Sequence, residues 1–322
     1  MQAAPPGASY FGKLPSRGDF IRANAGGRAM REFDAWIQRG VREASQQFGS
    51  GLAAAFEASG PTCFFVEVPN APHALAGALR PSRDRTGRRY PFLVAVEIEK
   101  QTLDGRRIPS WPDRYATFYH DAAALVDDAV EGRLAPEQLD SALQALRATY
   151  DRTPFPVDYE FRLRQAPADD LWSRTWGDAE DGRKYVLLKN LTEAVPQNGH
   201  GRAVKLPPLL RFPLPRPADG IDVSFWLETV WQLLGAPPHA SAFYWSLSAD
   251  GKGELLVAPS PSPPNVFVHL LGAEHPRPRV PRLDDASGQP AALAALALPA
   301  RYGTLLEEDA LSFCTFIERM SP

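Results

Sequence analysis

The side chains with the clearest chemical potential lie in two short polar segments. The first segment, residues 12–21, reads Gly-Lys-Leu-Pro-Ser-Arg-Gly-Asp-Phe-Ile and holds Arg17 and Asp19 on either side of a glycine. A turn of this composition brings the guanidinium and the carboxylate close together. There they can form a hydrogen-bonded ion pair with each other, or they can contact a partner.

The second segment, residues 80–91, places five arginines and one aspartate in one loop between two apolar runs. Guanidinium groups bind carboxylates and phosphates, so this loop can bind an acidic protein surface or a small anion. The alternative is a solvated hairpin in which the aspartate neutralises an arginine and Gly87 forms the turn. The candidate partner-binding residues of the two segments are Arg17, Asp19, Arg83, Asp84, Arg85 and Arg88.

Motifs that normally mark an enzyme are missing from the sequence. There is no phosphate-binding G-x-x-x-x-G-K-[ST], no G-x-G-x-x-G after a strand, no H-E-x-x-H and no G-x-S-x-G. No two histidines are four residues apart, and Cys63 and Cys314 each lie in an apolar pattern typical of core residues. We therefore predict no catalytic residue, no metal, no cofactor and no enzymatic activity.

Composition excludes several classes of protein. The chain has 322 residues, 44% of them hydrophobic, and a net charge of −3, which describes an ordinary globular protein. With a pI near 6.1 it has no overall basic field for binding nucleic acid. The longest apolar run, residues 291–298, is far shorter than the roughly 20 residues that span a bilayer. Two isolated cysteines and no recognisable signal sequence predict a cytoplasmic protein without membrane insertion.

The elements that must position the two polar segments follow from residue periodicity. Residues rich in β-branched and aromatic side chains predict strands, and apolar residues three or four apart predict helices. The predicted strands of the first half are residues 10–14, 62–68, 73–79 and 90–98, and its predicted helices are residues 28–48, 110–132 and 136–150. The arginine-rich loop therefore joins the third and fourth predicted strands.

The second half is less regular because it is rich in proline. Of the 32 prolines, 11 fall in residues 1–150 and 21 in residues 151–322, where they break the chain into short pieces. We predict a helix capped by Asp222 or Ser224 that ends at residue 234, and a hairpin of residues 243–247 and 254–258 around Asp250 and Gly251. A last helix opens at Thr304, in capping-box spacing with Glu307, and continues beyond residue 314.

Strands alternating with long amphipathic helices predict an α/β fold. We expect a layered sandwich with a central mixed or largely antiparallel sheet flanked by helices, followed by a proline-rich α+β second half. The predicted division is a domain over residues 1–150 and a region over residues 151–322 that can pack into the same core.

Several separated pieces of the first half resemble one known family. The pieces are residues 12–21, Asp34 with Trp36 on the first predicted helix, and Pro81-Ser82, Asp84-Arg85, Gly87-Arg88 and Tyr90-Pro91. Their order and spacing are similar to the amino-terminal domain of TagF, also called ImpM, a bacterial protein associated with type VI secretion. The resemblance covers about the first third to two-fifths of the chain.

This resemblance implies a non-catalytic cytoplasmic regulator that represses type VI secretion after translation. The implied partner is the forkhead-associated-domain scaffold protein of the secretion apparatus. Some relatives are fused to a PP2C-like phosphatase, but the second half of this chain lacks the aspartate-rich motifs of that enzyme. We therefore expect repression through binding, without dephosphorylation.

Two other interpretations of the arginine-rich loop stay open. The loop can hold a phosphate or a nucleotide, which would make the protein a small-anion sensor or an enzyme. Alternatively, both polar segments are structural, with Asp19 or Asp84 paired internally with an arginine. Loss of folding after substitution of Asp84 would be the signature of that last case.

Overall fold

The computed structural model describes residues 7–105, 107–152, 158–195, 205–238, 240–246, 253–271 and 280–321. Within them, one eight-stranded sheet runs through the protein in the order β2-β1-β5-β4-β3-β7-β8-β6, and every neighbouring pair is antiparallel. The strands are β1 (Ala8–Gly12), β2 (Ile21–Ala23), β3 (Thr62–Val66), β4 (His73–Arg80), β5 (Phe92–Glu99), β6 (Leu210–Pro213), β7 (Ser241–Trp245) and β8 (Glu254–Pro259). The predicted α/β fold with a largely antiparallel sheet is confirmed.

Both faces of the sheet are covered, which explains why its central strands are apolar on both sides. Successive side chains of a strand point to opposite faces. Cys63 and Phe65 accordingly enter one hydrophobic core, whereas Phe64 and Val66 of the same strand enter the other. Strands β3, β4, β5, β7 and β8 thereby each contribute to two cores.

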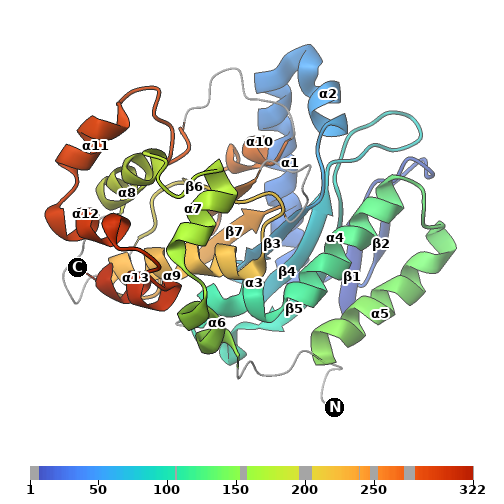
Figure 1. Cartoon of the computed structure of the whole chain (residues 1–322). Coiled ribbons are helices and arrows are strands. Elements are labelled where there is room, and N and C mark those ends of the chain that lie inside the picture. Colours follow the sequence, from blue (N-terminus) through green and yellow to red (C-terminus); the bar gives the residue numbers. More distant parts are fainter. Residues whose placement is uncertain are drawn as a thin grey trace.

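Helix α1 (Arg28–Phe48) covers one face together with α2 (Leu52–Glu57) and α10 (Val266–Leu270), as Figure 1 shows. The bounds of α1 match the prediction because its buried apolar residues recur at helical spacing and Gly49, with φ of 52°, ends it. Gly40 allows α10 to approach closely, since a Cβ atom there would lie 2.4 Å from Cβ of Phe267.

The other face carries most of the remaining helices (Figure 1). In the described residues the remaining helices are α3 (Trp111–Arg114), α4 (Ala116–Val130), α5 (Leu139–Arg152), α6 (Tyr159–Gln165), α7 (Ala168–Trp176), α8 (Arg183–Ala194), α9 (Gly220–Leu234), α11 (Ala291–Ala297), α12 (Ala300–Glu307) and α13 (Phe313–Arg319). Short 3₁₀ turns occur at Gly49–Gly51, Lys100–Thr102, Ile108–Ser110 and Pro136–Gln138. None of these helices combines the length and apolar character needed to cross a bilayer.

Three helix predictions were wrong at their ends. The helix predicted over residues 110–132 is divided at Tyr115, whose ψ of 28° is not helical. Helix α9 begins at Gly220 with Asp219 as its cap, because the Asp219 side chain and Asp222 form the capping box. The last predicted helix is two helices, and Ser312 caps the second by accepting a hydrogen bond from the Thr315 amide.

The predicted strands agree with the structure more closely than the predicted helix ends do. The first strand begins at Ala8 and ends at Gly12, which shifts it two residues toward the amino terminus. The pairing of β7 with β8 confirms the predicted antiparallel partners, whereas the predicted turn residues Asp250 and Gly251 lie outside the described residues. Periodicity did not reveal the short strands β2 and β6, because three or four residues are too few to show it.

The sheet continues across the predicted division of the chain. Strand β7 pairs with β3 over four residues, so the second half adds three strands to the sheet that the first half begins. Residues from both halves enter each hydrophobic core. The second half is thus built into the same layers as the first.

Candidate functional site

The two polar segments predicted from the sequence lie against each other at one end of the sheet. The Nζ atom of Lys13 lies 2.8 Å from Oδ2 of Asp84, and both side chains are buried. The Arg85 amide donates a hydrogen bond of 2.8 Å to the Arg17 carbonyl, and Nη2 of Arg88 donates one of 2.5 Å to the Gly18 carbonyl. The loop between β4 and β5 is thereby fastened to the turn that follows β1.

Asp84 organises the arginine-rich loop from inside. Its Oδ2 atom accepts hydrogen bonds from Lys13 Nζ at 2.8 Å and Arg88 Nε at 2.7 Å. Its Oδ1 atom accepts from the Thr86 amide at 2.9 Å, the Thr86 hydroxyl at 2.7 Å and the Arg88 amide at 3.0 Å. Burial alone would raise the pKa of Asp84, but these hydrogen bonds outweigh it and hold that pKa well below its ordinary value.

This geometry supports a structural role for Asp84. The neighbouring arginines differ from it, because their side chains stay exposed. The aspartate neutralises Arg88, as the hairpin alternative predicted, and Gly87 forms the turn with a φ of 87°. The Asp84 carboxylate is fully enclosed, so it positions the loop and is not available to a partner protein. Arg83, Arg85 and Arg88 all remain exposed around it.

The expected pair of Arg17 with Asp19 does not form. Arg17 instead donates to Oε1 of Glu137 at 2.8 Å, and Asp19 lies 3.9 Å from a guanidinium nitrogen of Arg88. All four residues of these two ion pairs are exposed, so the pairs are weak and a charged partner can replace them. Glu137 lies 120 residues from Arg17, which is why local spacing could not reveal it.

The remaining arginines of the loop fall into paired and unpaired groups. Arg83 donates to Oε1 of Glu57 at 2.9 Å, and both side chains are more than half exposed. Within the described part of the chain, the guanidinium groups of Arg85 and Arg89 have no acidic partner. Arg89 was part of the predicted loop but not one of its candidate residues.

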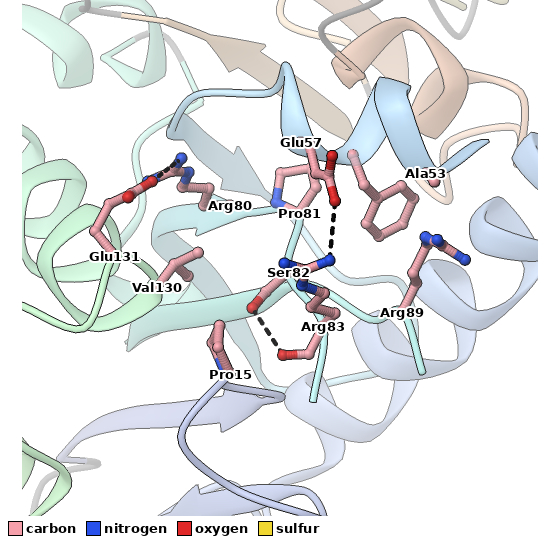
Figure 2. A pocket seen from close by; sticks show the side chains of 11 residues that line it. Pro15, Ala53, Glu57, Arg80, Pro81, Ser82, Arg83, Arg89, Val130 and Glu131 are labelled. Atoms are coloured by element: carbon pink, nitrogen blue, oxygen red, sulfur yellow. Dashed lines mark hydrogen bonds and ion pairs between the residues drawn. The ribbon is translucent and has the colours of Figure 1, made fainter. Parts of the chain in front are cut away.

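A cavity of about 280 Å³ opens beside the loop and is lined by Arg80, Arg83 and Arg89 (Figure 2). Arg80 is committed to the structure, since it donates to Asp127 at 2.6 Å and to Glu131 at 2.5 Å. Figure 2 also shows Arg83 paired with Glu57. With two of its three arginines already neutralised, the cavity is a poor match for phosphate or nucleotide.

Phe20 is the feature of this surface that sequence reasoning missed. Its side chain is 43% exposed, although it stacks on Phe11 with ring centroids 5.3 Å apart and meets the edge of Tyr90 at 5.0 Å. The ammonium group of Lys13 lies 4.8 Å from its ring centre. An exposed but rigidly packed phenylalanine between arginines is typical of a protein contact. The signal available in the sequence was a phenylalanine next to Asp19 in a polar turn.

The two cysteine thiols lie in surroundings that favour their protonated form. Burial raises the pKa of the Cys63 thiol far above its ordinary value, and burial together with the nearby Glu318 raises that of Cys314. Both thiols are therefore protonated and unreactive at neutral pH. Among the described residues, no group of three or more histidine, cysteine or acidic side chains is arranged to hold a metal ion.

These features define an α/β protein whose two halves share one antiparallel sheet and which displays an ordered arginine-rich surface at one end of that sheet. Residues 9–146 match the family model of the TagF N-terminal domain, described as type VI secretion system-associated. Residues 9–146 therefore form a domain of the TagF N-terminal type, and the resemblance seen in the sequence is confirmed for this part of the chain.

Comparison with other proteins adds little beyond this family. No curated protein sequence matches the chain. The crystal structure of PA0076 from Pseudomonas aeruginosa PAO1 is similar over 85% of this chain and 98% of that chain, with 17% sequence identity and a TM-score of 0.48. This likeness is too weak to support an inference about the function of this chain.

Proposed function

We propose that this chain is a non-enzymatic, post-translational repressor of type VI secretion that acts in the cytoplasm by binding the forkhead-associated-domain scaffold protein of the apparatus. The match of residues 9–146 to a type VI secretion system-associated domain supports the biological setting. The observation that carries the binding role is that two guanidinium groups, those of the exposed Arg85 and the partly buried Arg89, lack acidic partners among the described residues.

The hydrogen bonds to Asp84 support this role because they fix the loop before a partner arrives. A preformed loop loses little conformational freedom on binding, so more of the contact energy contributes to affinity. Arg17 and Arg83 flank the unpaired guanidiniums with weak, exposed ion pairs that a carboxylate-rich partner surface can replace. The partner surface is therefore expected to be acidic, with an apolar pocket for Phe20.

The test is the binding kinetics of the purified chain on the immobilised scaffold protein. We expect the double variant Arg85→Glu and Arg89→Glu to lower the association rate constant about tenfold or more at low ionic strength, since opposite charges steer association. Added salt should shrink the difference between wild type and variant, because salt screens charges that are in contact with solvent.

The matched control is the double variant Lys205→Glu and Arg216→Glu, which changes the net charge equally. Both residues are exposed, lack acidic partners among the described residues and flank β6, at the other edge of the sheet from β2. The control should bind as wild type does. Absence of wild-type binding would refute the proposed partner, whereas equal losses in both double variants would refute the proposed surface.

A further inference from the structure

The cavity beside the arginine-rich loop has apolar walls as well as charged ones. The apolar walls are Pro15 after β1, Ala53 and Phe56 of α2, Pro81 after β4 and Val130 at the end of α4. Pro15 is exposed, and Ala53 and Val130 are half-buried, so part of this apolar surface meets solvent. Its volume of about 280 Å³ lies just below the range of about 300–1,000 Å³ for pockets that hold drug-sized ligands. The cavity therefore has room for one or two side chains of another protein.

The charged residues that line the cavity leave one positive charge uncompensated. Arg80 pairs with Glu131, and Arg83 pairs with Glu57. Arg89 also lines the cavity, but its guanidinium has neither an acidic partner nor a hydrogen-bond acceptor among the described residues. Figure 2 accordingly shows ion pairs for Arg80 and Arg83 and none for Arg89. One carboxylate is enough to balance the charge of the cavity.

The backbone of the loop places Arg89 directly opposite Arg83. The two residues form an isolated antiparallel bridge. Side chains that face each other in such a pair have Cβ atoms about 4.5–5.5 Å apart, and like charges at that spacing repel each other. Glu57 compensates Arg83 from α2, whereas Arg89 is left without compensation in the described part of the chain. An acidic group brought by another molecule would remove this repulsion.

We propose that this cavity holds an apolar side chain of the partner protein together with the carboxylate of an adjacent aspartate or glutamate, which forms an ion pair with Arg89. This inference rests on the proposed function, because the occupant belongs to the protein that the arginine-rich surface binds. The apolar side chain favours binding by removing the walls at Pro15, Ala53 and Val130 from water. The guanidinium selects the carboxylate, since the two groups match in charge and in hydrogen-bonding geometry.

The first test is a titration of the whole ¹⁵N-labelled chain with the peptide acetyl-Gly-Leu-Asp-Gly-amide, followed by the arginine Nε–H signals. The variant Arg89→Gln identifies the Arg89 signal by its loss. We expect this signal to move saturably as the peptide is added, because the aspartate pairs with the guanidinium. Two control peptides, acetyl-Gly-Leu-Asn-Gly-amide without the charge and acetyl-Gly-Ser-Asp-Gly-amide without the apolar side chain, should each bind about fivefold or more weakly.

Two pairs of variants separate the apolar contact from the ion pair, with dissociation constants taken from the backbone amide signals that the peptide moves. Ala53→Phe fills the cavity and should weaken peptide binding about tenfold or more, whereas Ala54→Phe places the same ring on an exposed neighbouring position of α2 and should bind as wild type does. Arg89→Gln should weaken binding about tenfold, because a hydrogen bond to a charged group is lost. Arg39→Gln, which changes an exposed arginine of α1, is its control and should have no effect. Arg89→Gln keeps the proposal testable if Ala53→Phe disturbs the fold.

The cavity proposal is overturned by any of three results of the titrations. These are an Arg89 signal that does not move at millimolar peptide, a control peptide that binds as well as the leucine–aspartate peptide, and equal peptide binding by Ala53→Phe and Ala54→Phe.

The same alanine variants on the immobilised scaffold protein separate this proposal from the proposed function. Ala53→Phe should bind the scaffold about tenfold more weakly than Ala54→Phe does. Binding of both variants at wild-type affinity would overturn the cavity proposal and leave the proposed function standing. Absence of wild-type binding to the scaffold would refute the proposed partner, and the peptide titration then decides the cavity by itself.

Discussion

The sharpest quantitative prediction concerns Glu228, a largely desolvated carboxyl group on α9. Oε1 of Glu228 accepts a hydrogen bond of 2.9 Å from the Tyr159 hydroxyl of α6, and among the described residues no ion pair reaches it. Burial raises the pKa of Glu228 to about 7, and the hydrogen bond from Tyr159 opposes that rise only in part. Glutamine at this position keeps the size of the side chain and an acceptor for Tyr159 but cannot ionise.

The magnitude follows from the difference between the folded and unfolded pKa values. The unfolded chain loses the Glu228 proton near pH 4.5, whereas the folded protein keeps it up to about pH 7. The folded state therefore binds more protons between these values, and the free energy of unfolding falls as the pH rises through this window. A difference of about 2.5 units, at about 1.36 kcal/mol each, amounts to about 3 kcal/mol lost by pH 8.

We therefore expect Glu228→Gln to be about 3 kcal/mol more stable than wild type at pH 8, and to differ much less near pH 5. Urea unfolding monitored by circular dichroism at both pH values gives the free energies. Glu99→Gln, which changes an exposed carboxylate without an ion pair among the described residues, is the matched control and should follow wild type. Part of the pH dependence should persist in Glu228→Gln, because burial also raises the pKa of Asp113 to about 6, despite the opposing charge of Arg162.

The reasoning about Glu228 fails if wild type loses no stability between pH 5 and pH 8, or if Glu228→Gln loses as much as wild type does. The first result would mean that water or a cation reaches the carboxylate in the folded protein. The second would place the titrating group elsewhere.

Three further predictions concern the scaffold of the arginine-rich loop and its ligands. Lys13→Met leaves the buried Asp84 without its ammonium partner, so it should lower the melting temperature by roughly 5 °C or more. An unchanged melting temperature would contradict the structural role of the Lys13–Asp84 pair. Gly77→Ala places a Cβ atom on β4 only 2.0 Å from the Val94 carbonyl oxygen of the neighbouring strand β5. We expect a lower melting temperature or loss of soluble protein, because the two strands cannot stay paired at that distance. A melting curve like that of the wild type would show that the strands can move apart without cost. Inorganic phosphate should leave the melting temperature unchanged, whereas a dose-dependent rise would favour the anion-binding interpretation of the loop.

Local features of the sequence determined much of this fold. The helix over Arg28–Phe48 and the strand from His73 were predictable because their signals lie within a few residues. The helix has apolar side chains at helical spacing and a glycine at its end, and the strand is a short continuous apolar run. The loop between β4 and β5 was predictable for the same reason, since two apolar runs flank it. The family resemblance also rests on short motifs that can be compared without a structure.

Only the tertiary structure decided which charged groups of that loop are available. Arg17 and Arg83 are neutralised by acids 120 and 26 residues away, whereas Arg85 and Arg89 have no such partner among the described residues. Phe20 likewise gained its rigid, exposed position from contacts with β1 and the far side of the loop. Sequence spacing sets side-chain neighbours within one element, but burial and ion pairing depend on which elements the folded sheet brings together. That is why the residue types of this surface could be predicted and their pairing could not.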